Sequence, residues 1–142
     1  MKIYADSSFI VSLYTPDANS VKANRVLRAG GVRLWLTTYG ELEVINAMGL
    51  RVFRKEVSEE QLASSLLEFQ NDLSTGLLKL HGLTDAIIER AVQLSRRLTV
   101  KIGARAADIL HVAAAIELEV DYLYTFDEKQ RKLAQTLHLE LN

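Results

Sequence analysis

Apolar positions along the chain fall into short runs separated by longer stretches with helical spacing. The short runs carry β-branched and aromatic side chains and predict strands. Apolar residues three and four positions apart predict helices between them. We expect strands at 2–6, 32–38, 77–80, 122–125 and 137–141. We expect helices at 7–14, 18–29, 39–55, 58–76, 84–101, 105–119 and 127–135.

The order of these elements predicts the fold class. Strands that alternate with helices form a parallel sheet, and the crossover helices must then lie on its two faces. We therefore expect an α/β fold, a three-layer α/β/α sandwich with a mostly parallel central sheet. Ligands bind to such sheets outside the carboxyl ends of the strands, where the strand order reverses. Residues at those ends are the ones to inspect for chemistry.

Composition narrows the possible chemistry. The chain has 142 residues, 49% apolar and 25% charged, which is typical of one globular domain covering residues 1–142. The absence of cysteine excludes disulfides, thiolate metal sites and a cysteine nucleophile. His81, His111 and His138 are far apart and show no metal-ligand spacing. A bound metal would therefore have oxygen ligands, as Mg²⁺ or Mn²⁺ does.

Nothing in the sequence indicates a membrane or an export signal. The longest apolar stretch, around 109–116, is about ten residues, whereas a membrane span needs roughly twenty. Asp6 stands where a signal peptide would have its apolar core. We therefore expect a cytoplasmic protein with no membrane contact. The formal net charge of −1 also leaves contact with a polyanion open.

Four acidic residues stand at the predicted carboxyl edge of the sheet. Asp6 ends the first strand, and Asp127 follows closely after the fourth. Glu43 lies in the first turns of the helix after the second strand, and Asp108 lies near the start of the helix at 105–119. Taken singly, Asp6 and Asp127 could be helix caps, Asp108 could favour a helix start, and Glu43 could be an exposed residue.

Taken together, the four acids indicate a metal site. Two carboxylates about 5 Å apart repel by about 3 kcal/mol at an effective dielectric constant of about 20. Four of them therefore need protons or a cation among them. Mg²⁺ or Mn²⁺ in such a site polarises phosphoryl oxygens and activates water. From the residues alone, we expect metal-dependent hydrolysis of phosphodiester bonds.

Four short motifs then follow one another along nearly the whole chain. They are Y-A-D-S-S from Tyr4, E-V-I-N-A from Glu43, R-A-A-D-I-L-H-V-A-A-A from Arg105 and Y-T-F-D from Tyr124. With these motifs the chain resembles a PIN domain, most closely the ribonuclease toxins of the VapC type. Each motif alone is weak, but all four in this order and at these separations are specific.

The resemblance implies a function for the four acids. Asp6, Glu43, Asp108 and Asp127 correspond to the acidic residues with which the family binds metal and cleaves its substrate. It implies an Mg²⁺- or Mn²⁺-dependent endoribonuclease, the toxin of a toxin–antitoxin pair, with RNA as substrate. Its VapC-like members commonly form homodimers and are inhibited by a small antitoxin that packs among the early and middle helices. Alternatives are a PIN-fold nuclease in RNA processing or on DNA, and a catalytically silent PIN-fold binding protein.

The second acid of the set has a competitor. Glu41 lies two residues before Glu43, and the two side chains point about 200° apart on a helix, so both cannot face one site. Asn46 and Ala47 follow Glu43 at the spacing that is usual in the family. We choose Glu43 and keep Glu41 as the alternative.

Several neighbours of the acids are candidate supporting residues. The hydroxyl groups of Ser7 and Thr125 could orient a carboxylate, or they could bond within turns and caps. Asn46 could bond within the site, and Arg105 could contact a substrate phosphate or pair with an acid. His111, one turn after Asp108, could be a general base. We expect it instead to be a hydrogen-bonded structural histidine, because the metal already supplies the nucleophile.

Overall fold

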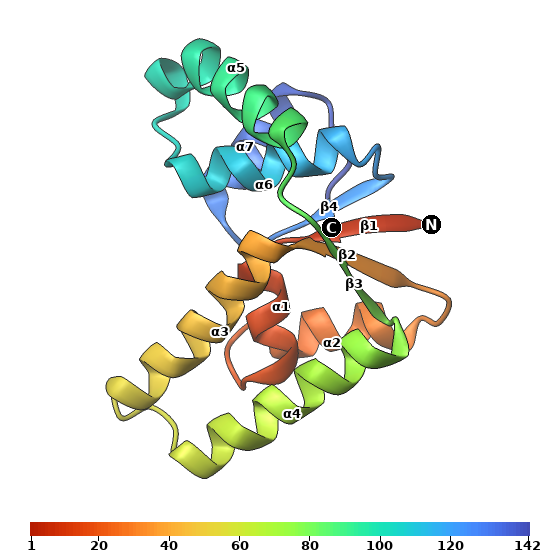
Figure 1. The fold of residues 1–142 in the computed structure, drawn as a ribbon, viewed down its shortest axis with the longest axis vertical. Coiled ribbons are helices and arrows are strands. Elements are labelled where there is room, and N and C mark those ends of the chain that lie inside the picture. Colours follow the sequence, from red (N-terminus) through yellow and green to blue (C-terminus); the bar gives the residue numbers. More distant parts are fainter.

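A computed structural model describes all residues, 1–142, and its centre is a four-stranded parallel sheet (Figure 1). The strands are β1 (Lys2–Ala5), β2 (Arg33–Thr37), β3 (Leu78–His81) and β4 (Tyr122–Tyr124). Their order across the sheet is β3-β2-β1-β4. The chain therefore moves outward from β1 to β3 and then returns to the other side of β1. This reversal makes the carboxyl end of β1 the expected ligand crevice.

Helices cover both faces of this sheet, which confirms the predicted α/β/α sandwich (Figure 1). On one side lie α1 (Ser7–Tyr14), α2 (Ser20–Arg28), α3 (Thr38–Phe53) and α4 (Glu59–Thr75). On the other lie α5 (Asp85–Ile102), α6 (Ala106–Glu117) and α7 (Glu128–Thr136). None of these helices is long and apolar enough to cross a membrane.

The predicted fifth strand at 137–141 is wrong. After α7 the backbone turns at His138, which has a positive φ of 59°. Only the following residues reach the edge of the sheet. Leu123 N donates to Glu140 O at 2.8 Å, and Leu141 forms a single parallel bridge to Leu123. The segment is thus too short beside β4 to form a strand of its own.

Alternation along β1 divides the interior into two apolar cores. Ile3 and Ala5 belong to the core beneath α1–α4, and Tyr4 belongs to the core beneath α5–α7. Successive side chains of a strand point to opposite faces, so one short strand serves both cores. Phe69 of α4 is buried in the first core, with Leu62, Leu66 and Leu73 packed against it. This apolar stripe therefore covers the core.

Local capping fixes where the helices near the sheet edge begin. Thr37 caps α3 by accepting a hydrogen bond from Gly40 N, and Ser58 forms the predicted capping box with Gln61 on α4. Thr84 caps α5, which ends at Gly103 with a φ of 68°. Such caps satisfy backbone groups that a helix end leaves unpaired. The Thr37 cap, on the last residue of β2, places the first turn of α3 at the carboxyl edge of the sheet.

Candidate functional site

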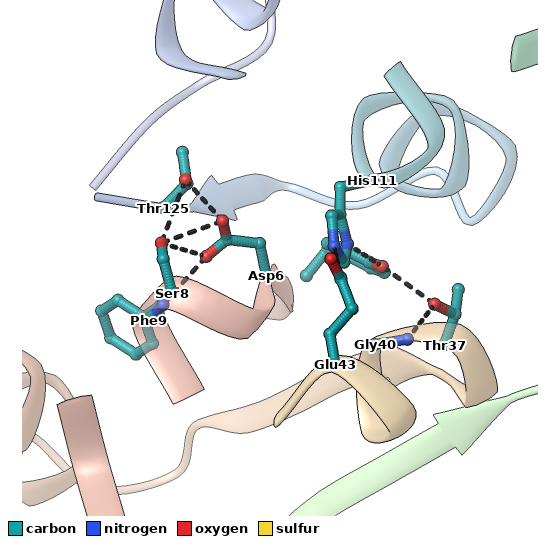
Figure 2. A network of polar contacts seen from close by, with 9 residues as sticks. Asp6, Ser8, Phe9, Thr37, Gly40, Glu43, His111 and Thr125 are labelled. Carbon is teal, nitrogen blue, oxygen red and sulfur yellow. Dashed lines mark hydrogen bonds and ion pairs between the residues drawn. The ribbon is translucent and has the colours of Figure 1, made fainter. Parts of the chain in front are cut away.

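Asp6 lies directly after β1 and is completely buried. Its Oδ1 accepts a hydrogen bond from Phe9 N at 2.9 Å, so it caps α1. The Ser8 hydroxyl donates to both carboxylate oxygens, and the Thr125 hydroxyl donates to Oδ2 at 2.8 Å (Figure 2). Burial raises the pKa of Asp6, while these donors act to lower it. The site thus contains a buried acid surrounded by donors.

Thr125 joins Asp6 to Asp127. Its hydroxyl, which donates to Asp6, also accepts a hydrogen bond from Asp127 N at 2.9 Å. The Ser8 hydroxyl makes a parallel link by accepting from Phe126 N at 3.0 Å. Asp127 in turn caps α7, where its Oδ1 accepts from Lys129 N and Gln130 N. The loop after β4 is therefore tied to the end of β1 through two hydroxyl groups.

Asp108 lies in the first turn of α6 and is almost fully buried, at 3% exposure. Its Oδ2 accepts a hydrogen bond from Arg105 N at 2.9 Å, which holds the start of the helix. The Arg105 guanidinium lies 3.8 Å from the same oxygen, although its side chain is 82% exposed. The Arg105 guanidinium is therefore a solvent-exposed cation next to the buried carboxylate of Asp108.

Glu43 reaches from the second turn of α3 across the edge of the sheet to α6. Its Oε1 bonds His111 Nε2 (Figure 2), and His111 Nδ1 bonds Tyr4 Oη at 2.8 Å. Tyr4 Oη also lies 3.3 Å from the hydroxyl of Thr37, the residue that caps α3. We call these four residues, Thr37, Tyr4, His111 and Glu43, the tyrosine–histidine chain. The expectation that His111 is hydrogen-bonded is confirmed.

Negative charge gathers around the tyrosines of this edge. Burial raises the pKa of Tyr4, and the charges of Asp6 and Glu43 raise it further. The pKa of Tyr39 is also raised, first by burial and then by the charges of Glu43 and Asp108. Both phenols therefore stay protonated at neutral pH. Glu43 thus shares Tyr4 as a neighbour with Asp6, and it shares Tyr39 with Asp108.

The donor set suits a hard divalent ion, but the acids do not form a single ligand cluster. Three acids each keep one oxygen without a hydrogen-bond partner: Glu43 Oε2, Asp108 Oδ1 and Asp127 Oδ2. No three acidic or histidine side chains come together as ligands of one ion. Carboxylate oxygens without nitrogen or sulfur partners match the preference of Mg²⁺ and Mn²⁺.

Three of the sequence candidates lie apart from these contacts. Ser7 forms no side-chain hydrogen bond and lines an open groove of about 400 Å³ beside Asp127. Asn46 is exposed, one turn beyond Glu43. Glu41 forms no ion pair, whereas Glu43 contacts α6 through His111, so the geometry favours Glu43 over Glu41.

Sequence reasoning missed Ser8 and Tyr4. Ser8, and not the predicted Ser7, donates to the Asp6 carboxylate, because the side chain of the second residue after a capping aspartate turns back towards the cap. That signal was available in the Asp-Ser-Ser spacing of 6–8. Tyr4 had no such signal, because its partner His111 is 107 positions away.

Solved structures with the same fold include toxin proteins. VapC20 of Mycobacterium tuberculosis, described as a toxin that cleaves the sarcin–ricin loop, matches with a TM-score of 0.72 and 17% identity over 92% of this chain and 94% of its own. VapBC2 of Rickettsia felis, bound to a promoter DNA fragment, matches with a TM-score of 0.70 and 20% identity over 100% of this chain and 98% of its own. A toxin–antitoxin complex of Klebsiella pneumoniae matches with a TM-score of 0.60 and 16% identity over 90% of this chain and 88% of its own. Among curated protein sequences none matches significantly.

The sequence itself matches the PIN domain family. The match covers residues 3–135 and so includes most of β1 and nearly all of α7. All four acids lie inside this range, at the carboxyl edge of a parallel sheet whose fold the solved structures share. The chain belongs to the PIN domain family.

Proposed function

We propose that residues 1–142 form one PIN nuclease domain, a metal-dependent endoribonuclease that is the toxin of a toxin–antitoxin pair. The observation that carries this proposal is the placement of the four acids. They come from four separate segments, lie at the edge where strand order reverses, and three of them offer an unpaired oxygen. Membership of the PIN family supports the same conclusion.

Asp6, Glu43, Asp108 and Asp127 are the residues that would hold Mg²⁺ or Mn²⁺. When bound, such an ion supplies Lewis-acid chemistry, which polarises a phosphoryl oxygen and activates water. Ser8 and Thr125 orient the Asp6 carboxylate through their hydroxyl groups. The exposed Arg105 guanidinium, beside Asp108, is placed to contact a substrate phosphate.

RNA and an antitoxin protein are the proposed partners. VapC20 is described as cleaving the sarcin–ricin loop, and the Klebsiella pneumoniae structure is a toxin–antitoxin complex. These proteins share the fold of this chain along nearly its whole length, which supports a substrate and a partner of the same kinds. We further propose that the protein is cytoplasmic and forms a homodimer.

The test is cleavage of labelled structured RNA by the antitoxin-free protein in Mn²⁺ and in EDTA. Asp108→Asn removes a carboxylate charge but keeps an oxygen that can accept from Arg105 N, so the start of α6 is retained. We expect this variant to cleave at least about 100-fold more slowly, since changes outside the ligands alone reduce metal sites about 10–100-fold. Asp85→Asn is the matched control, because Asp85 is the first-turn acid of α5.

Each outcome has a definite meaning. Cleavage only with Mn²⁺, lost in Asp108→Asn and kept in Asp85→Asn, supports the proposal. Cleavage of a labelled DNA strand of the same sequence, but not of RNA, indicates a DNA nuclease instead. A folded protein that neither binds Mn²⁺ nor cleaves would contradict the metal site and return the four acids to capping and surface roles.

A further inference from the structure

We propose that His111 is a positioning residue for Glu43, itself aligned by Tyr4, and that the tyrosine–histidine chain holds Glu43 in place for the metal. This inference rests on the proposed function, because it concerns how one of its four acids is held. Its evidence is independent, since it comes from contacts of His111 and Tyr4, neither of which is a proposed ligand.

The hydrogen bonds of the tyrosine–histidine chain begin and end at α3. The chain begins at Thr37, the cap of α3, passes through Tyr4 of β1 and His111 of α6, and ends at Glu43 on the second turn of α3. Gly40 N donates to the Thr37 hydroxyl at 3.1 Å, so the starting atom is itself fixed. The chain therefore starts at the cap of α3, crosses to β1 and α6, and returns to α3 on its second turn.

The protons of this chain can be assigned without leaving a buried group unpaired. With a neutral ring, His111 Nε2–H donates to the Glu43 carboxylate, and Nδ1 accepts from Tyr4 Oη–H. Tyr4 Oη then accepts from the Thr37 hydroxyl, which itself accepts from Gly40 N. Both nitrogens of the ring are engaged, so the ring cannot rotate without breaking a hydrogen bond.

Packing holds the ring as firmly as the hydrogen bonds do. His111 is 1% exposed and lies between Tyr4 and Tyr39, with ring centroids at 5.8 and 6.1 Å. Its Cε1 lies 3.5 Å from the position a Cβ on Gly40 would take, so the ring lies close to α3 at a residue without a side chain, next to Leu36. The ring is therefore a fixed donor.

A fixed donor matters most for Glu43, which is the least constrained acid of the site. Its side chain is 25% exposed and has no other hydrogen bond. A free glutamate side chain loses conformational entropy when it is ordered. His111 orders Oε1 in advance and leaves Oε2 unpaired. Asp6, by contrast, is already held by three donors of its own.

The test is a double-mutant cycle on Mn²⁺ affinity, measured by calorimetric titration without RNA. The cycle comprises wild type, His111→Phe, Glu43→Gln and the double variant. We expect His111→Phe to weaken Mn²⁺ binding by about 10–100-fold, the usual effect of removing a group that orients a ligand. We expect the double variant to bind no more weakly than Glu43→Gln alone, because His111 acts only through Glu43.

Two further variants separate positioning from a general loss of structure. His111→Gln keeps a side-chain N–H near the place of Nε2, and we expect it to recover most of the affinity that His111→Phe loses. Tyr4→Phe keeps the aromatic ring and removes only the hydroxyl, so we expect a smaller loss in the same direction. If His111→Phe does not fold, these two variants carry the test. His81→Phe, outside the chain, is the control and should bind as wild type does.

Other outcomes overturn the inference. If the losses of His111→Phe and Glu43→Gln multiply in the double variant, His111 does not act through Glu43. If His111→Phe binds Mn²⁺ more tightly than wild type, His111 competes for Glu43 rather than positioning it. Wild type that binds no Mn²⁺ contradicts the proposed function, and the inference with it, whereas multiplying losses in a protein that binds Mn²⁺ contradict the inference alone.

Discussion

Asp6 and Glu43 approach the same edge of the sheet but are held in opposite ways. Asp6 is fully buried and accepts hydrogen bonds from two residues that follow it closely, Ser8 and Phe9, and from Thr125. Glu43 is partly exposed, and its one bond is to His111, 68 positions away. The first acid is held mainly by its own segment and the second only by the tertiary fold.

This contrast separates stability from function within one site. The Asp6 carboxylate is buried, and burial raises its pKa, so the ionised form is disfavoured by the fold even with three donors around it. Glu43 is partly exposed, and we expect it to affect the folding free energy little. Changes at Asp6 and its donors should therefore change folding free energy, and changes at Glu43 should change mainly the chemistry.

The largest effect on stability is expected from Thr125→Val. The substitution keeps the shape of the side chain but removes a buried hydroxyl that serves Asp6 and Asp127 N together. Leaving such buried groups unpaired should lower the free energy of unfolding by about 2 kcal/mol. For a chain of this size the melting temperature would fall by about 4–8 °C. Thr99→Val, on the exposed face of α5, is the control.

A smaller effect, of opposite sign, is expected from Asp6→Asn. Because the pKa of Asp6 is raised in the fold, its contribution to stability is fully present below its unfolded pKa of about 3.9 and is lost as pH rises through the folded pKa. Asparagine caps helices about as well as aspartate and carries no charge. The variant should therefore melt about 2–4 °C higher than wild type at pH 7, a gain of about 1 kcal/mol.

Two measurements sharpen the Asp6→Asn prediction. Melting curves near pH 4 should show the difference between the variant and wild type shrinking, since wild type is then protonated as well. Millimolar Mn²⁺ should raise the melting temperature of wild type and not that of the variant, because only the native state with its full carboxylate set binds the ion. A variant less stable than wild type at pH 7 would show that the donors around Asp6 outweigh its burial.

The smallest stability effect is expected from Glu43→Gln. The amide oxygen can still accept from His111 Nε2, and the side chain remains partly in water. The free energy of unfolding without metal should change by no more than about 0.5 kcal/mol. Chemical denaturation at neutral pH measures this change. A loss as large as that of Thr125→Val would remove the contrast between the two ends of the site.

The parts of the molecule that sequence predicted well are those that short-range physics determines. The parallel sheet follows from alternating strands and helices, and the capping box of Ser58 and Gln61 from a three-residue spacing. Asp6 and Asp127 were predicted both as possible caps and as site residues, and both cap helices at the predicted edge. Capping uses only part of a carboxylate's bonding capacity, so the two interpretations were never exclusive for Asp127.

The parts that sequence could not supply depend on distant partners. Nothing near Tyr4 indicates that its hydroxyl meets His111, and nothing near Glu43 indicates which face of α3 will meet α6. The choice between Glu43 and Glu41 therefore needed the packing of two layers. The false strand at 137–141 arose similarly, since its apolar pattern was correct but a turn at His138 left it too little length beside β4.

Strand β1 contributes side chains to both cores, and this affects how the protein tolerates insertions and deletions. Its four residues supply Ile3 and Ala5 to one core, Tyr4 to the other, and Asp6 immediately after them. A single residue added or removed there would exchange the faces of every side chain and carry the acid away from Thr125. Chain-length variation among homologues should therefore be absent from 2–6 and concentrate in exposed connections such as 54–58.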